Sequence, residues 1–484
     1  MRDLVRLIMI EQEANPFCLC HRLIPPLRHS CAQTADSPRG LAMTKDAVTS
    51  HQEASGLKRM GANIAWLFGG KGFGAICSIA YLAILARSLG IRDFGHFSLI
   101  FATGQAFVAL AGFQSWQTMV RYGTRYVHAQ DWVKFGRLSM LCGLLDWIGA
   151  TLGCVVAWIG YYIFADDLGL NPAYIDMAFA FNCVLLWSRV SAPVGIVRVL
   201  DRFDIAVYVE GLVPLGRLLA ALLLWFTGPT VGKFLFAWAA IDLLSAAAYW
   251  ISARWIAPTS LRARHIGDWR TTLTENEGIA RFFGVTYASS TLDIAFKQGP
   301  VLAVGYFLGT SAAGIYRLAD QLAQGFGKLS QLVGRAIYSD INRSRVAQTA
   351  AQFRQLVKRV TAIAGIGSIL IVTLALLLAR QLLGFIGGEG YESGAVIFVP
   401  LALAASLEMA SVAYEPVLHA TNHARLALLA RILAIAALGC GMLLLVSQGS
   451  LGIAWAVVAG QAFGYLAMGT MVLIAMRKMG HSQV

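Results

Sequence analysis

The chain has 484 residues, of which 57% are hydrophobic and only 13% are charged, and its formal net charge is +13. Soluble globular proteins have about 25% charged residues, so this chain has too few charges to cover a surface that faces water. The composition excludes a water-soluble protein, and the long apolar stretches leave little room for a soluble catalytic domain. We therefore predict an integral membrane protein that is not an enzyme.

Residues 1–57 differ from the rest of the chain because they contain four prolines and lack sustained hydrophobic periodicity. We expect a disordered N-terminal extension here, and Met43 or Met60 could be the true start. The segment Cys18–His21 could be taken as part of a zinc site. Chance cysteines in an unstructured tail explain it better, so we expect no metal and no cofactor.

Twelve apolar stretches of spanning length follow, and each is near the 20 or so residues that a membrane helix needs. We predict an all-α polytopic membrane protein with two parallel six-helix lobes, at residues 58–257 and 279–478. A cytoplasmic linker at 258–278 joins them, and residues 479–484 form a C-terminal tail. The predicted spans are Ala62–Ala86, Phe94–Phe113, Leu138–Phe164, Ala173–Pro193, Ala206–Phe226, Lys233–Ile256, Ile279–Leu308, Ala312–Arg335, Val357–Ala379, Gly394–Tyr414, Ala427–Val446 and Ile453–Met476.

Lysine and arginine are distributed unequally between the loops on the two sides of the membrane. One side receives dense clusters such as Arg121–Arg137 and Arg335–Arg359, whereas the loops on the other side are short and nearly free of cations. Because positive residues stay on the cytoplasmic side, we predict that both termini are cytoplasmic. This asymmetry accounts for much of the net charge, so we expect no nucleic-acid partner.

The two halves of the chain repeat each other. A shift of 219 residues places Leu89-Gly90 on Leu308-Gly309 and Gly95 on Gly314, with seven identities over the 22 positions that begin at Leu89. Six helices in each half return the chain to the same side, so the repeats are parallel. Transporters commonly hold their substrate in a central cavity between two such halves.

The segment Leu85–Ile100 resembles the end of the first helix and the start of the second in exporters of polysaccharide biosynthesis. These O-antigen-type flippases for lipid-linked oligosaccharides belong to the same superfamily as multidrug extruders and the lipid II flippase. Leu308–Leu322 is similar to the matching element of the second half, and Arg198–Asp204 resembles the loop after the fourth helix. One departure is Tyr338–Ile341, where many relatives carry a proline.

This resemblance implies a central cavity that opens alternately to each side of a bacterial inner membrane. It implies that a sugar linked to polyprenyl pyrophosphate moves from the cytoplasmic to the outer leaflet. The implied partners are this lipid-linked glycan, membrane lipids, and the glycan polymerase and glycosyltransferases of the same pathway. The glycan, the energy source (proton, sodium or membrane potential) and the oligomeric state stay open.

Charged residues inside a bilayer are costly and mark a pathway or a buried pair by default. In the eighth predicted span, polar residues recur at spacings of four and three, which places them on one helical face. Such a stripe suits a water-filled cavity that holds a diphosphate and sugar hydroxyls. The alternative is a surface helix in which Asp320 pairs with Arg317. The stripe consists of Arg317, Gln321, Gln324, Lys328, Gln331 and Arg335.

Further charged residues lie within other predicted spans. We predict that Lys71, Arg217 and Lys297 are further cavity cations, and that Asp242, Asp293 and Glu408 are candidates for proton or cation coupling. Lys71 could instead extend to the cytoplasmic surface. Asp293 and Lys297 are four residues apart and could neutralise each other, whereas Glu408 is expected near the middle of the membrane.

We compare three candidate functions with these observations. A flippase for a lipid-linked glycan precursor needs cations for the pyrophosphate and no covalent chemistry, and we favour it. A cation-coupled multidrug exporter of the same superfamily would need acidic groups in a cavity that we expect to be net positive. A membrane glycan polymerase or ligase would need a larger external loop than the chain offers around Asp166 and Glu389.

Overall fold

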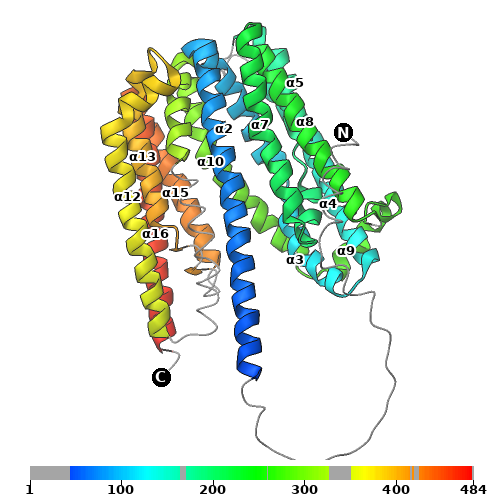
Figure 1. Ribbon diagram of the computed structural model, residues 1–484. Helices are drawn as coiled ribbons and strands as arrows, with labels where there is room; N and C mark the ends of the chain where they lie inside the picture. The colour runs from blue at the N-terminus through cyan, green and yellow to red at the C-terminus, as the bar shows by residue number, and fades with distance from the viewer. Residues whose placement is uncertain are drawn as a thin grey trace, which may run out of the picture. The chain divides into compact units, whose positions relative to one another are not determined.

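The computed structural model describes residues 44–163, 171–258, 260–325, 350–414, 417–418 and 424–481, and no strand occurs within these ranges. The chain divides into the units Met1–Ile64 and Ala65–Val484, and the following concerns the second. A helical segment over 310–325, here called the eighth span, has no label in Figure 1. The labelled helices are α2 (Thr44–Ala111), α3 (Ser115–His128), α4 (Trp132–Ile163), α5 (Ile175–Trp187), α6 (Ser191–Val199), α7 (Phe203–Thr227), α8 (Val231–Ile256), α9 (Trp269–Glu275), α10 (Ile279–Leu308), α12 (Ala350–Gly387), α13 (Ala395–Ala410), α15 (Ala424–Leu445) and α16 (Gly449–His481).

The prediction of an all-helical polytopic membrane protein is confirmed. Eight regions in the described part of the chain are long and apolar enough to cross a membrane. Two of them, Gly72–Ala111 and Leu428–Ile474, each contain two predicted spans, so the eight regions account for ten of the twelve. The other two predictions fall on α10 and the eighth span, which are helical but more polar.

One boundary differs from the sequence-based expectation. The first helix begins at Thr44, inside the segment that we expected to be unstructured up to residue 57. Its early start has a physical reason, because no proline follows Pro38 until Pro172 and nothing therefore interrupts the helix. The predicted linker at 258–278 lies between α8 and α10 and contains α9, which packs against α4.

Glycines end the first and seventh spans in the same way. Gly90 divides α2 into a first and a second span, and its φ is 72°. Gly309 follows α10 with φ 85°. Glycine adopts positive φ without the steric penalty of a Cβ atom. These two residues are partners in the sequence repeat, so the two halves turn at equivalent places.

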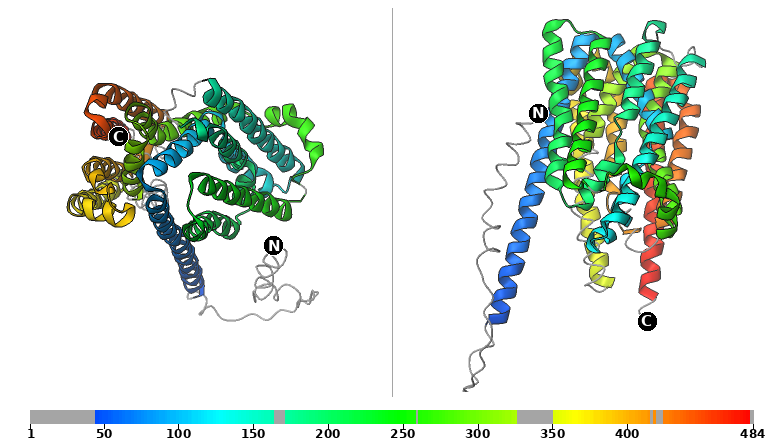
Figure 2. Two further views of the ribbon diagram at one scale, coloured as in Figure 1. Left: turned by 90° about the horizontal axis from the view of Figure 1, so that it is seen from above. Right: turned by 90° about the vertical axis from the view of Figure 1, so that its right-hand side faces the viewer.

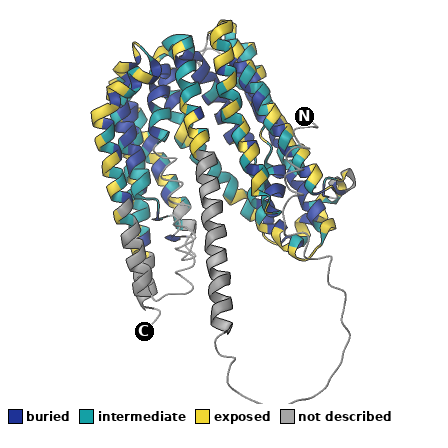
Figure 3. Cartoon of the chain, in the orientation of Figure 1, coloured by how far each residue is buried: buried dark blue, intermediate teal, exposed yellow. Residues whose placement is uncertain are grey.

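The described helices of unit Ala65–Val484 form two groups (Figures 1 and 2). One group contains α12, α13, α15 and α16, and the other contains α3 to α8. Many residues on the outward faces are exposed (Figure 3). The exposed side chains include large apolar ones such as Phe226 and Phe385, as a lipid-facing surface requires.

The two halves contact each other most closely where the second and eighth spans cross. A Cβ atom on Gly95 would lie 1.9 Å from the carbonyl oxygen of Thr310, and one on Gly314 would lie 2.5 Å from that of Ile91. The contacts are reciprocal, because Ile91 and Thr310 are also repeat partners. Small residues at these positions let the two backbones touch.

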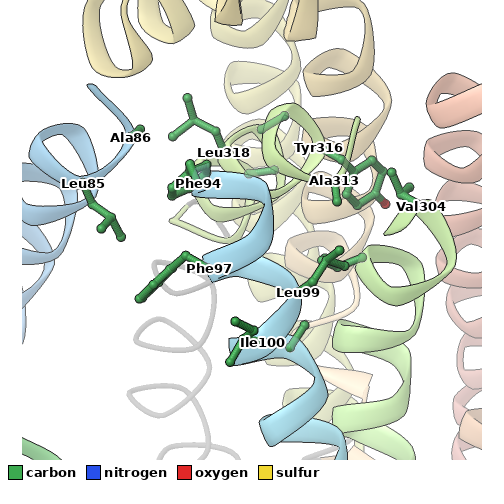
Figure 4. Close-up of a cluster of buried hydrophobic side chains, with 14 of the residues drawn as sticks. Leu85, Ala86, Phe94, Phe97, Leu99, Ile100, Val304, Ala313, Tyr316 and Leu318 are labelled. Atoms are coloured by element: carbon green, nitrogen blue, oxygen red, sulfur yellow. The ribbon is translucent and has the colours of Figure 1, made fainter. Parts of the chain in front are cut away.

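Large buried side chains surround this crossing (Figure 4). The figure shows Phe94 and Phe97 of the second span near Leu318 of the eighth span. The ring of Phe94 packs edge-on against Tyr391, with 6.1 Å between the ring centroids. One end of the structure is therefore closed by apolar contacts between the halves.

Away from the crossing, the second span also packs along α10. The Thr291 hydroxyl donates to the carbonyl oxygen of Ala109 at 2.8 Å, and the Tyr287 hydroxyl donates to that of Leu110. These carbonyls lie in the last turn of α2, where no intrahelical donor is available. The hydroxyls of α10 thus satisfy the end of the second span and join the halves along this seam.

Candidate functional site

A cavity of about 350 Å³ lies between the halves, next to the helix crossing. Its lining is mainly apolar and contains two arginines, one from each half, and no carboxylate among the described residues. The lining residues are Ala75, Ser78, Ile79, Tyr81, Leu82, Leu85, Phe94, Phe97, Ser98, Phe101, Arg217, Trp238, Arg317, Gln321, Leu322, Gly325, Leu382, Ile386 and Phe398.

Arg317 reaches the cavity from the eighth span and is only 5% exposed. Its Nη1 lies 3.5 Å from Oδ2 of Asp320 and donates to Oε1 of Gln298 at 3.3 Å. With its side-chain amide turned to satisfy both partners, Gln321 accepts from Nη2 of Arg317 at 2.6 Å. The expected Asp320–Arg317 contact exists, but the arginine is buried between helices and not on a surface helix.

Arg217 reaches the cavity from α7 and pairs with Asp242 of α8. One guanidinium nitrogen contacts both carboxylate oxygens, at 2.9 and 3.0 Å, and both side chains are mostly buried. Glu210, which shares a face of α7 with Arg217 in the sequence, pairs instead with Arg198. The pairing follows from the packing of α7 on α8, which a helical face alone does not reveal.

Phe101 connects the two arginines. Its ring centroid lies 5.7 Å from the guanidinium carbon of Arg217 and 5.9 Å from that of Arg317. The ring of Trp238 also faces Arg217, at 5.4 Å. Aromatic faces attract cations, so these rings hold both guanidinium groups in place without neutralising them.

The remaining predicted binding residues lie in different surroundings. Gln324 donates to Asp320 at 2.7 Å and does not line the cavity, and Lys297 is exposed on α10. The side chain of Lys71 and all of Lys328 lie outside the described residues. Of the predicted set, the structure brings Arg217, Arg317 and Gln321 together in one cavity.

The three coupling candidates do not cluster. Asp242 is the counter-ion of Arg217, while Asp293 forms an ion pair with Arg431 of α15 at 2.9 Å. Asp293 thus has an ion-pair partner on another helix, and its neutralisation by Lys297 stays a prediction. Glu408 lies in the last turn of α13, which ends at Ala410.

Arg189 is a charged residue that the sequence-based analysis did not single out. It lies in a break of the fourth span and donates to Oε1 of Gln105 at 2.8 Å. The signal was present, because Arg189 is the only charged residue between Ala178 and Pro193. Within the described residues, no group of three or more His, Cys, Asp or Glu side chains could hold a metal ion.

Comparison with known proteins identifies the family and the fold of the chain. A family model described as "Polysaccharide biosynthesis protein" matches residues 60–338. The chain is similar to "Inner membrane protein YghQ" of Escherichia coli (strain K12), with 25% identity over 335 residues, which cover 68% of this chain and 92% of that protein.

Two solved structures share the fold. One is an inward-facing multidrug resistance MATE family transporter of the MOP superfamily, with a TM-score of 0.71 and 13% identity over 85% of this chain and 96% of that one. The other is the lipid II flippase MurJ in an inward closed conformation, with a TM-score of 0.65 and 12% identity over 85% of this chain and 89% of that one. With the fold of these transporters and a family match over more than half of its length, the chain belongs to the polysaccharide biosynthesis protein family.

Proposed function

We propose that this protein is a flippase that moves a glycan precursor linked to polyprenyl pyrophosphate from the cytoplasmic to the outer leaflet of a bacterial inner membrane. The observation that carries the proposal is the meeting of Arg217 and Arg317, from the two halves, in one cavity without a carboxylate in its described lining. Arginine forks suit phosphate oxygens, and the apolar remainder of the wall suits a lipid substrate. The family match and the fold shared with a lipid II flippase support the same substrate class.

The orientation follows from the charge distribution of the loops. Arg121, Arg125 and Arg137 lie around α3 and the start of α4, at the end opposite the crossing of Gly95 with Gly314. The positive-inside rule assigns the basic end to the cytoplasm, so the crossing closes the external side. In this state the cavity receives its substrate from the cytoplasm, and separation at the crossing would release the head group outside.

Each half then rotates as a rigid body, and the cavity cations act only by binding the pyrophosphate. They neutralise the pyrophosphate while the polyprenyl chain stays in the lipid, so no bond is made or broken. The energy for the movement would enter through Asp242, Asp293 or Glu408 in our proposal. The name of the relative YghQ is consistent with an inner-membrane location.

Deletion of the gene in its host tests the flippase directly. We expect the lipid-linked glycan to accumulate on the cytoplasmic face and surface polysaccharide to be lost. Complementation with Arg217→Gln or Arg317→Gln should fail although the protein reaches the membrane. Arg202→Gln, an exposed arginine paired with Asp204, is the matched control and should restore the polysaccharide.

The test also separates the main alternative. A cation-coupled multidrug exporter would leave surface polysaccharide normal after deletion and would raise sensitivity to cationic drugs. A glycan polymerase or ligase would leave short or unattached glycan on the outer face. Either result would overturn the flippase proposal.

A further inference from the structure

The fourth span, in the first half of the chain, is broken into two helices. Helix α5 ends at Trp187 and α6 begins at Ser191, and Arg189 lies between them. Such a break leaves backbone N–H groups without intrahelical partners at the start of the second segment. Within a membrane these groups need another acceptor, because water is absent.

Asp146 of α4 supplies that acceptor. One carboxylate oxygen accepts hydrogen bonds from the backbone N–H groups of Ser191 at 2.8 Å and Ala192 at 2.6 Å. The other oxygen accepts from the hydroxyl of Ser115 at 2.7 Å. A buried carboxylate with three donors stabilises the start of α6, so the break has a fixed geometry.

The break places Arg189 beside the first-half wall of the cavity. The side chain is exposed, and its Nη2 donates to Oε1 of Gln105 at 2.8 Å. Gln105 lies one helical turn beyond Phe101, whose side chain lines the cavity and whose ring centroid is 5.7 Å from the guanidinium carbon of Arg217. Asp242 is already in contact with Arg217 at 2.9 Å. Arg189, Arg217 and Asp242, here the first-half triad, therefore contain two cations and one carboxylate.

The second half contains a matching arrangement. Arg317 contacts Asp320 at 3.5 Å and donates to Gln298, the residue that follows Lys297 on α10, at 3.3 Å. Lys297, Arg317 and Asp320 form the second-half triad. Each triad contains one more cation than carboxylates, and one arginine of each triad lines the cavity, Arg217 in the first half and Arg317 in the second.

We propose that Arg189 is a binding residue for the anionic head group, and that Asp146 is the residue that positions it. This inference rests on the proposed function, whose substrate carries negative charge on both phosphates. One phosphate engages the first-half triad through Arg189 and Arg217, and the other engages Arg317. The carboxylates Asp242 and Asp320 hold the cations when the cavity is empty.

Binding of geranylgeranyl diphosphate to the purified full-length protein in detergent tests Arg189, with geranylgeraniol as the uncharged comparison. Because hydrogen bonds to charged groups are strong, Arg189→Gln should weaken diphosphate binding about tenfold and leave binding of the alcohol unchanged. Arg189→Lys keeps the charge and should recover part of the affinity. Arg380→Gln, which removes an exposed arginine paired with Glu392, is the matched control and should bind normally.

The outcomes distinguish this inference from the proposed function. If Arg189→Gln binds the diphosphate normally while Arg217→Gln and Arg317→Gln do not, Arg189 has no binding role and the flippase proposal stands. If none of the three variants changes diphosphate binding, both proposals fail. An equal loss of diphosphate and alcohol binding in Arg189→Gln would indicate a structural role and would overturn the inference.

The role of Asp146 is tested by a double-mutant cycle. Asp146→Asn should weaken diphosphate binding in the wild-type background and have no further effect once Arg189 is already Gln, because the two residues act on the same contact. Additive losses would show that Asp146 does not act through Arg189. Asp176→Asn, which changes an exposed carboxylate bonded to Tyr162, serves as the control.

Discussion

Arg217 and Arg317 reach one cavity from opposite halves of the chain, and each has a carboxylate within contact distance. Neither carboxylate is among the residues that line the cavity, whereas both arginines are. Aromatic rings complete their surroundings, since Phe101 lies near both guanidinium groups. The site is thus positively charged toward a ligand although its surroundings are nearly neutral.

Asp242→Asn should destabilise the protein, because it leaves the guanidinium of Arg217 in a mostly buried position without its counter-ion. Breaking a buried pair costs about 3 kcal/mol or more. The melting temperature of the purified protein in detergent should therefore fall. Asp204→Asn breaks the much more exposed pair with Arg202 and is the control, for which exposed pairs predict a cost of about 0–1 kcal/mol. Equal melting temperatures for the two variants would contradict the prediction.

Glycines decide how closely the helices approach at the closed end. Gly95 and Gly314 allow the second and eighth spans to touch through their backbones, and the equivalent positions of the repeat contact each other reciprocally. A Cβ at either position meets a carbonyl oxygen, which cannot move without moving its helix. The closure is therefore a property of two elements and not of a single side chain.

Gly314→Ala should lower the melting temperature, because the added Cβ would lie 2.5 Å from the carbonyl oxygen of Ile91. Overpacking of this kind costs about 1–3 kcal/mol. Gly299→Ala on α10 has no atom within 4 Å of the added Cβ and should leave the melting temperature unchanged or slightly higher. If both variants melt like the wild type, the close crossing does not stabilise this conformation.

On the scale of the molecule, Arg87 joins the two halves at the closed end. Its Nε donates to the carbonyl oxygen of Ile386 at 3.3 Å, and its Nη2 donates to that of Phe385. These carbonyls belong to the last turns of α12, where partners within the helix are lacking. The contact exists only while the halves are together, so it favours the closed end over any state in which they separate there.

Arg87→Ala should therefore increase the fraction of molecules in which the two halves are separated at this end. Spin labels on Phe226→Cys and Val396→Cys, in a background without native cysteines, report the distance between exposed sites of the two halves at this end. We expect a larger fraction of long distances, by about five- to 150-fold if the lost contacts contribute 1–3 kcal/mol. Arg92→Ala, an exposed arginine nearby, should leave the distribution unchanged, and an unchanged distribution for Arg87→Ala would contradict the role of the contact.

The sequence alone determined the class of protein, ten of the membrane-crossing stretches and the relation between the halves. These properties depend on local composition and on periodicity within short windows, which tertiary contacts do not alter. The repeat also identified Gly90 and Gly309 as equivalent positions from the sequence alone. The polar stripe placed Arg317 and Gln321 on one helical face, and both residues line the cavity.

Only the tertiary structure decided which charges meet. Arg217 shares a helical face with Glu210 but pairs with Asp242. Asp293 pairs with Arg431 of α15, a helix that is far from α10 in the sequence. The exposed Arg189 lies in a break between two helices, which positions it beside the cavity. Asp146, on a different span, stabilises this break by accepting hydrogen bonds from the backbone at the start of α6. Partners of this kind depend on which helices pack together and on their rotation about their own axes. Helical periodicity specifies the face of a residue but not the neighbour opposite that face.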